Sequence, residues 1–411
     1  MTATVLRGDA RQLPLADASV DLIVTSPPYW ALRSYTDGGE HYDGQIGAEP
    51  TPAAFVDSLI EATRDWMRVL KPSGSLWVNL GDKYNSAASG QNLRDAAGKD
   101  GRGTKRYDGG RGESLRSVPT KSLIGLPWRY AIRCVDELGL ILRAEVIWSK
   151  PNGLPESVTD RVRRSHETWF HFTKSPRYFA AVDNVREPQD PVSLTHHAKY
   201  RGRYQGTNPN RADQGTGNFA MNPLGKLPGS VWTIATQPLK VPAELGIDHF
   251  AAFPMEWPRR IILGWSPSGI CTACDEGRRP VVSSQRTLDG EPVDLGGWKR
   301  GGVQQETTGV GNYRYGTDRT ITGEACACPD TSAPTRPAVV LDPFGGTGTT
   351  ALVAKAYGRR GISLDMSADY CRLAEWRTND PGQIAAAMQV EKPSKEFDGQ
   401  QDLFSELGGA A

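Results

Sequence analysis

Short apolar runs alternate with a longer stretch of helical spacing near the start of the chain. Residues 5–9, 20–24 and 75–80 are short and rich in apolar or β-branched side chains, which predicts strands. Between the last two, residues 52–70 repeat apolar side chains on one helical face. The pattern therefore predicts a strand, a helix and another strand in succession.

The same alternation returns further along the chain. Residues 128–138 are predicted to form a helix, and residues 140–148 and 168–172 to form strands. Residues 338–377 then repeat the order of strand, glycine-rich turn, helix and strand. Strands that alternate with helices are typical of a mostly parallel sheet with helices on both faces. The predicted fold class is therefore α/β.

Polar, irregular stretches interrupt this pattern. Residues 83–122 hold nine Lys or Arg against four acids and almost no apolar side chains, so we expect a mobile basic loop there. The interruptions divide the chain into a first half at 1–182, an insert at 183–245, a second half at 246–270 and 331–378, a cysteine-rich insert at 271–330 and a polar tail at 379–411.

Composition limits the classes of function. The formal net charge is +1 over 411 residues, so binding to an acidic polymer depends on local patches. No run approaches the roughly 18 apolar residues of a membrane span, and the N-terminus lacks the regions of a signal peptide. We expect a cytoplasmic protein with no membrane partner, and the sequence does not determine its oligomeric state.

A turn with the sequence T-S-P-P-Y-W, residues 25–30, directly follows the predicted strand 20–24. Its two prolines fix φ and remove two backbone donors, so the turn is stiff. The backbone carbonyls, the Ser26 hydroxyl and the Tyr29 ring are then held ready to grip a flat ligand. A planar ring that carries an exocyclic amine suits this turn.

A second turn, P-F-G-G-T-G-T-T at residues 343–350, joins the predicted strand 338–342 to a helix. Glycines in such a turn let a ligand approach the backbone closely. The next strand, 360–364, ends at Asp365, where an acidic side chain can accept hydrogen bonds from ribose hydroxyls. This arrangement predicts a nucleoside-binding site.

Other nucleotide-binding classes share part of this second pattern. G-x-G-x-x-A at 346–351, followed by Asp365, also satisfies the dinucleotide fingerprint of dehydrogenases. The D-P-F lead-in at 342–344 and the separate turn at 25–30 count against a dehydrogenase. A phosphate-binding P-loop is excluded because no Lys follows the glycines at the required spacing.

Together the two motifs resemble those of the DNA methyltransferases that methylate the exocyclic amine of cytosine (N4) or adenine (N6). The S-P-P-Y motif precedes the D-P-F-x-G-x-G-T motif, which is the permuted order of that family's beta group. The resemblance implies a Rossmann-like class I S-adenosylmethionine-dependent methyltransferase fold. It also implies a catalytic half at 1–182, target recognition by 183–245, and a cofactor-binding half at 246–270 and 331–378.

The resemblance assigns roles to individual residues. It implies that Asp9 lies near the adenine of S-adenosylmethionine and that Asp365 holds its ribose. The remaining residues that it implies for the cofactor are Asp342, Phe344, Gly346, Gly348 and Thr349, and the residues that it implies for catalysis are Ser26, Pro27, Pro28 and Tyr29.

An exocyclic amine needs hydrogen-bond acceptors before it can attack, because its lone pair is delocalised into the ring. The Ser26 hydroxyl and the Pro27 carbonyl are the candidate acceptors, and the Tyr29 ring is the candidate to stack on a base flipped out of the duplex. The methyl group then passes directly from sulfur to nitrogen. No cysteine follows a proline, which excludes the carbon-5 cytosine methyltransferases.

Ser26 before Pro-Pro favours cytosine N4 as the target, and adenine N6 is the alternative. A second alternative is a catalytically inactive DNA-binding module with the methyltransferase fold. The resemblance further implies a bacterial or phage-encoded protein with double-stranded DNA as its partner. A cognate restriction endonuclease is a further candidate partner.

Four of the six cysteines form two close pairs, Cys271-x-x-Cys274 and Cys326-x-Cys328. Four thiolates can close a tetrahedral structural zinc site, so we predict one Zn²⁺ there. Free surface cysteines are the alternative.

Arginine and lysine side chains in three segments are the candidate DNA contacts. Such contacts to phosphate predict an affinity that falls steeply with salt. The candidates are Arg102, Lys105, Arg106, Arg161, Arg163, Arg164, Arg201 and Arg203.

Overall fold

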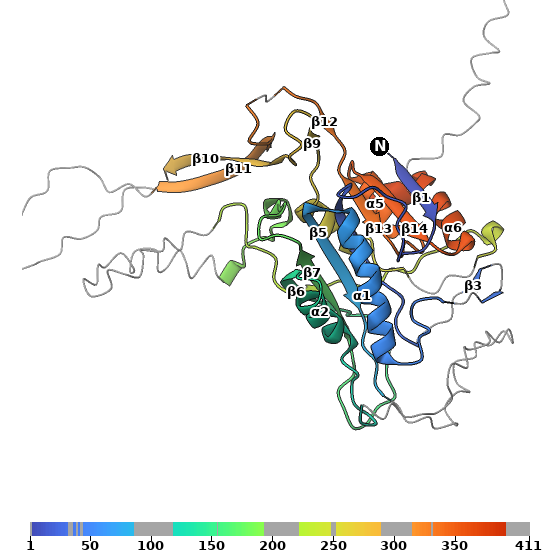
Figure 1. Ribbon diagram of the computed structural model, residues 1–411. Coiled ribbons are helices and arrows are strands. Elements are labelled where there is room, and N and C mark those ends of the chain that lie inside the picture. The colour runs from blue at the N-terminus through green and yellow to red at the C-terminus, as the bar shows by residue number, and fades with distance from the viewer. Residues whose placement is uncertain are drawn as a thin grey trace, which may run out of the picture.

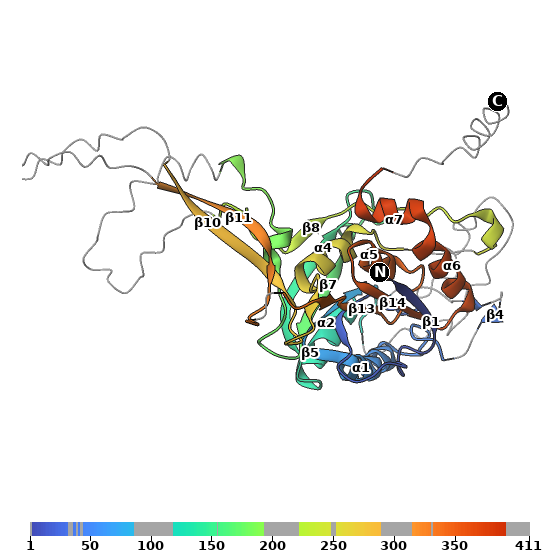
Figure 2. The ribbon, with the colours of Figure 1, turned by 90° about the horizontal axis from the view of Figure 1, so that it is seen from above.

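A central sheet covered by helices on both faces forms the body of the protein (Figure 1). Figure 2 shows this sheet between α1 on one side and α4, α5 and α7 on the other. The computed structural model describes residues 2–31, 36–37, 40–41, 44–85, 118–153, 155–192, 222–247, 252–288, 315–329 and 332–391.

The sheet has eight strands in the order β1-β14-β13-β2-β5-β7-β6-β8. All neighbours are parallel except that β7 runs antiparallel to both β5 and β6. Antiparallel neighbours need no helical crossover, which agrees with the absence of a helix among the described residues between β6 and β7. The strands are β1 (Ala3–Arg7), β14 (Arg360–Asp365), β13 (Val339–Asp342), β2 (Val20–Thr25), β5 (Leu70–Leu80), β7 (His166–Thr173), β6 (Ile141–Ser149) and β8 (Val231–Thr233).

The apolar run in β2 is explained by burial on both faces of the sheet. Ile23 packs into the core on the side of α1 (Pro52–Val69) and α2 (Leu126–Asp136). Leu22 and Val24 pack into the core on the opposite side, with α4 (Glu256–Trp265) and α5 (Thr349–Ala356). Because successive strand residues point to opposite faces, a strand covered on both sides carries apolar residues on both of its faces.

Element boundaries follow local capping. Helix α1 begins after Thr51, whose hydroxyl accepts a hydrogen bond from the amide of Ala54 at 3.1 Å, with a proline in the first turn. Helix α2 begins at Leu126, two residues before the predicted start, because Pro127 also occupies a first-turn position. The predicted mostly parallel α/β sheet is confirmed.

The fold continues into the predicted polar tail. After α6 (Ala368–Asn379), helix α7 (Pro381–Met388) packs Ile384 and Ala387 against the core that contains α5. No helix in the described part of the chain is both long enough and apolar enough to cross a bilayer.

The remaining strands lie outside the main sheet. A two-stranded ribbon of β10 (Arg279–Leu288) and β11 (Tyr315–Ala325) projects away from the body (Figure 2). At its base, β9 (Ile270–Cys271) pairs with β12 (Thr335–Arg336). The other short elements are β3 (Thr36–Asp37), β4 (Glu40–His41), η1 (Val182–Val185) and η3 (Ala243–Leu245).

Candidate active site

One cavity of about 430 Å³ receives side chains from all eight strands of the main sheet or from the residues next to them. Its size falls within the range of small-molecule sites. The carboxyl ends of parallel strands meet at one edge, so residues that follow different strands converge there. The lining includes Gly8–Arg11 after β1, Ser26–Tyr29 after β2, Asn79 in β5, Lys150 after β6, Glu167 in β7, Thr236–Pro238 after β8, Pro343–Thr347 after β13, and Asp365 and Met366 at the end of β14.

The two motifs meet because β2 and β13 are neighbours. Val340 and Leu341 of β13 pair with Leu22 and Ile23 of β2, so both strands end side by side. The Thr350 hydroxyl, in the first turn of α5, lies 3.3 Å from the carbonyl oxygen of Val24. The turn after β2 and the turn after β13 therefore face one cavity.

The glycine turn lies directly on β14. The amide of Gly345 donates to the carbonyl of Leu364 at 2.8 Å, and a Cβ on Gly345 would lie 1.9 Å from the Ser363 hydroxyl. Gly348 adopts a left-handed φ of +73° at the start of α5, where a Cβ would meet Ala374. Only glycine is compatible with these contacts, which explains the residue type at both positions.

The predicted cofactor residues divide into two sets. Those of the first set line the cavity: Asp9, Phe344, Gly346, Thr349 and Asp365. Asp342 and Gly348 do not line it and instead hold the turn in place.

Asp342 is buried and anchors the turn from below. Its carboxylate accepts the Thr350 hydroxyl at 2.9 Å and the Phe344 amide at 3.1 Å. Burial raises the pKa of Asp342 to about 6, because desolvation outweighs these hydrogen bonds.

Two carboxylates stand at the ends of neighbouring strands on the cavity wall. Asp365 accepts the amides of Gly346 and Ser367, both at 2.9 Å. Asp9 is paired with Arg11, with 2.7 Å between Arg11 Nη2 and Asp9 Oδ2. Partial burial alone would raise the pKa of Asp9, but the hydrogen bonds from Arg11 outweigh it and lower the pKa below its ordinary value. Fixed carboxylates at these places suit the hydroxyl and amine donors of an adenosyl group.

The S-P-P-Y turn belongs to a hydrogen-bond network. The Ser26 hydroxyl donates to Asn79 Oδ1 at 3.2 Å, and the Tyr29 hydroxyl lies 2.7 Å from both Asn79 Oδ1 and Glu167 Oε2. Asn79 is itself held by a bond from Nδ2 to the carbonyl of Thr168 at 3.1 Å, and Glu167 is paired with Lys150. The network fixes the orientation of both hydroxyls.

The Tyr29 ring is also fixed by its backbone surroundings. It lies against Gly81, where a Cβ would come within 2.6 Å of Tyr29 Cε2. The neighbouring Trp30 donates its indole N–H to the carbonyl of Glu49 at 2.8 Å, and Lys83 Nζ lies 5.3 Å from the Trp30 ring centre. Contacts with both Tyr29 and Trp30 therefore hold the turn in one conformation.

Sequence reasoning missed Asn79, Lys150 and Glu167 as site residues. Asn79 is a polar residue inside the apolar run of β5 and is only 1% exposed. A buried side-chain amide must find hydrogen-bond partners. A polar residue inside an apolar strand could therefore have marked Asn79 as a site residue from the sequence alone. Nothing local distinguishes Glu167, because its role depends on β7 lying beside β5.

The predicted DNA contacts have different surroundings. Arg161 stacks on the Tyr84 ring at 3.8 Å and pairs with Glu156, and Arg164 is largely buried beside Asp82. Arg163 is exposed and donates to the carbonyl of Gly153 at 2.9 Å. The remaining candidates, Arg102, Lys105, Arg106, Arg201 and Arg203, lie outside the described residues.

The sulfur atoms of Cys271, Cys274, Cys326 and Cys328 lie within 4.8 Å of one another, and none of these residues lines the cavity. The other two cysteines, Cys134 in α2 and Cys371 in α6, are buried.

The parallel sheet, the glycine turn and the carboxylate at the end of the next strand define a class I S-adenosylmethionine-dependent methyltransferase. The family model described as DNA methylase, which covers N6 and N4 methyltransferases, matches residues 20–271 and 332–376. The chain belongs to this family and is a DNA methyltransferase. The segment between the two matched stretches, 272–331, lies outside the match.

Known proteins resemble the chain over most of its length. It is 29% identical to the Type II methyltransferase M.SmaI of Serratia marcescens, over 91% of this chain and 89% of that protein. It is 35% identical to M.Cfr9I of Citrobacter freundii, over 65% of this chain and 74% of that protein. A solved structure described as PvuII DNA methyltransferase (cytosine-N4-specific) shares the fold, with a TM-score of 0.50 and 18% identity, over 95% of this chain and 92% of that one.

Proposed function

We propose that this DNA methyltransferase transfers a methyl group from S-adenosylmethionine to N4 of cytosine in double-stranded DNA. The observation that supports cytosine is Ser26, which occupies the first position of the S-P-P-Y turn and faces the same cavity as the glycine turn. The solved structure with this fold is described as cytosine-N4-specific, so the fold accommodates that reaction.

The geometry of Ser26 suits an acceptor of an amine proton. Its hydroxyl hydrogen is directed at Asn79 Oδ1, which leaves the oxygen lone pairs available to a donor in the cavity. The Pro27 carbonyl is the second acceptor in this proposal. Two acceptors draw on both N–H bonds and localise the nitrogen lone pair, and such preorganised acceptors stabilise the charge that develops during transfer.

The residues proposed to bind the cofactor lie on the cavity wall. Asp365 and Asp9 are proposed to accept hydrogen bonds from the adenosyl group, with Phe344 and Gly346 along the same side. When bound, S-adenosylmethionine supplies an electrophilic methyl group on sulfur. The residues of this chain orient the amine, hold its protons and exclude water.

The target base must leave the duplex to reach this cavity, at a cost of a few kcal/mol. Stacking on an aromatic ring returns about 1 to 3 kcal/mol per base, which is the role proposed for Tyr29. The Type II methyltransferases among the relatives support a cognate restriction endonuclease as a partner in the same host.

Sequencing at base resolution, together with nucleoside mass spectrometry, tests the proposal on DNA from a host that expresses the chain. We expect N4-methylcytosine at one recognition sequence and none in a host that expresses Ser26→Ala. N6-methyladenine instead would assign the adenine target. No methylated base, with DNA and S-adenosylmethionine still bound by the purified protein, would indicate an inactive binding module.

A further inference from the structure

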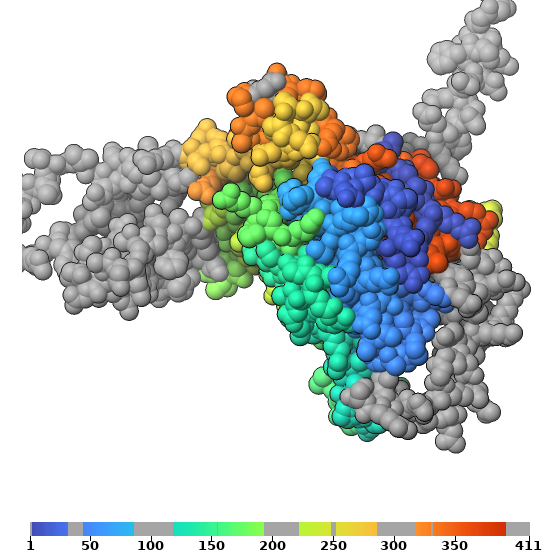
Figure 3. All heavy atoms as spheres, viewed as in Figure 1, coloured from blue at the N-terminus to red at the C-terminus, as the bar shows by residue number. Residues whose placement is uncertain are grey.

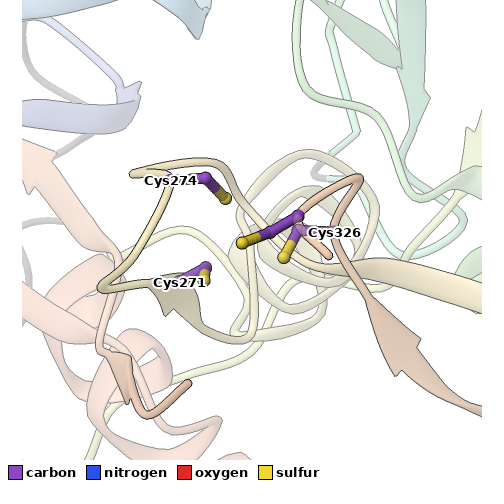
Figure 4. A group of neighbouring side chains, drawn as sticks. Cys271, Cys274 and Cys326 are labelled. Atoms are coloured by element: carbon purple, nitrogen blue, oxygen red, sulfur yellow. The ribbon is translucent and has the colours of Figure 1, made fainter. Parts of the chain in front are cut away.

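Two cysteine pairs that are far apart in the sequence come together where the β10–β11 ribbon joins the body. Cys271 ends β9, Cys274 follows in the next turn, and Cys326 and Cys328 follow β11. All four are free thiols whose sulfur atoms lie within 4.8 Å of one another. Figure 4 shows the sulfur atoms of Cys271, Cys274 and Cys326 turned toward a common centre.

The backbone around the first pair is folded so that both thiols face the same side. The carbonyl of Cys271 accepts the amide of Asp275 at 2.9 Å, and the amide of Cys271 donates to the carbonyl of Glu276 at 2.9 Å. Asp275 adopts a left-handed φ of +58°, which completes a tight turn. This turn places Cys274 back over Cys271.

The turn is braced against the methyltransferase body. The Thr272 amide donates to the carbonyl of Pro334 at 3.0 Å, and Arg278 donates to the carbonyl of Ala333 at 2.6 Å. Gly277 packs so closely on Pro267, just after α4, that a Cβ would lie 2.4 Å away. The first cysteine pair therefore has a defined position before any metal binds.

Core packing does not account for the cluster. Three of its four cysteines are partly exposed, whereas the two other cysteines of the chain are buried in helices. A tetrahedral ZnS₄ site has Zn–S distances near 2.3 Å and therefore S···S distances of about 3.8 Å. The observed sulfur–sulfur distances, all within 4.8 Å, exceed this value by about 1 Å at most.

We propose that Cys271, Cys274, Cys326 and Cys328 bind one Zn²⁺ ion that joins the two ends of the β10–β11 ribbon to the methyltransferase body. Four protein ligands leave no open position, so the ion is structural. It closes a long loop of chain, the case in which a metal clip contributes most to stability. In Figure 3 the yellow and orange atoms of this region gather at one edge of the molecule.

This zinc site lies outside the family's shared fold. The family match stops at residue 271 and resumes at 332, so three of the four ligands belong to an insertion. None of the four cysteines lines the cavity. Zinc binding is therefore independent of the proposed methyl transfer, and each can fail without the other.

Metal content of the purified chain, measured by plasma mass spectrometry without an affinity tag that binds metal, tests the proposal. We expect one zinc per chain in the wild type and in Cys134→Ala, and less than a tenth of that in Cys274→Ser/Cys326→Ser. Zinc-free wild type, zinc retained by the double variant, or iron in its place would overturn the proposal.

Cobalt substitution gives a second readout without DNA. Co²⁺ added to the chelator-stripped wild type should produce intense visible bands of tetrahedral thiolate coordination, and zinc should abolish them. The affinity for S-adenosylmethionine should stay within twofold when zinc is removed. Absence of the bands in protein that keeps its circular dichroism, or loss of cofactor binding on zinc removal, would contradict a closed structural site outside the cavity.

Discussion

At the scale of single residues, Asn79 connects the elements of the active site. Its amide oxygen accepts from both Ser26 and Tyr29, and its amide nitrogen is held by β7. The buried amide orients two hydroxyls at once, so its loss removes this partner from both, and of the two only Tyr29 keeps its contact with Glu167. Asn79 is thus a positioning residue whose effect is exerted through Ser26.

Replacing Asn79 by alanine should lower kcat at least tenfold, which corresponds to about 1.4 kcal/mol of barrier height. The dissociation constant for S-adenosylmethionine should change less than twofold, because the proposed cofactor residues are not part of this network. Steady-state kinetics on a DNA substrate and isothermal titration measure the two quantities. Asn379→Ala, at the exposed end of α6, is the control and should leave both unchanged. An unaltered kcat in Asn79→Ala would contradict the positioning role.

The raised pKa of Asp342 predicts how the free energy of unfolding depends on pH. Its pKa is raised from an ordinary 3.8 to about 6, so between these values the folded chain keeps a proton that the unfolded chain releases. This contribution to stability is present below pH 4 and is lost as pH rises to about 6.

Asp342→Asn cannot ionise and should not lose this stability. Urea unfolding from pH 4 to 7 should show the variant improving relative to wild type by up to about 3 kcal/mol over this range. A difference between the two proteins that does not change with pH would show that Asp342 keeps an ordinary pKa.

At the scale of elements, the sheet and its helices approach so closely that side chains are excluded at particular points. Gly361 in β14 is one such point, since a Cβ there would lie 2.5 Å from the carbonyl oxygen of Ala351 in α5. Gly345 is another, and it keeps the turn in contact with β14. The position of the glycine turn over the cavity therefore depends on packing between α5 and β14.

Gly361→Ala should destabilise the protein by about 1 to 3 kcal/mol, the usual cost of overpacking a core. It should also weaken binding of S-adenosylmethionine, because α5 and the turn before it must shift together. Gly323→Ala in β11 is the matched control, since nothing lies within 4 Å of its added Cβ. Thermal unfolding compares the two variants, and equal melting temperatures would argue against the packing constraint.

At the scale of the whole molecule, the near-neutral charge makes DNA binding a matter of local surfaces. The cavity opens at one edge of the sheet, and Arg163 is exposed in the connection between β6 and β7 that supplies Lys150. Arg164 is three-quarters or more buried, with its Nη1 atom 3.9 Å from Asp82 Oδ2. Exposure, which the sequence does not reveal, separates a candidate phosphate contact from a structural arginine.

DNA affinity should fall steeply as salt rises, because phosphate contacts release counterions. Arg163→Ala should reduce the slope of log K against log salt by about 0.9, the value for one phosphate contact. Arg372→Ala, a similarly exposed arginine on α6, is the control and should leave the slope unchanged. Fluorescence anisotropy over a salt series measures both, and a flat response in the wild type would contradict phosphate binding altogether.

Local sequence patterns predicted the secondary structure, the family and the cysteine cluster of this protein. Periodicity predicted the strands and helices because a strand buried on both faces, such as β2, carries apolar residues on both faces. The two motifs predicted the family because their glycines and prolines meet backbone requirements that few other residues satisfy. The clustering of the four cysteines was likewise predicted from their spacing.

Only the tertiary structure determines which distant segments of the chain contact one another. The antiparallel insertion of β7 between β5 and β6 places Glu167 within 2.7 Å of Tyr29, although 138 positions separate them in the chain. Burial distinguishes Asp342, beneath the turn, from Asp365, on the cavity wall. Local sequence determines which residues a strand or turn accepts, whereas strand order and burial determine which of their side chains meet, and the active site depends on both.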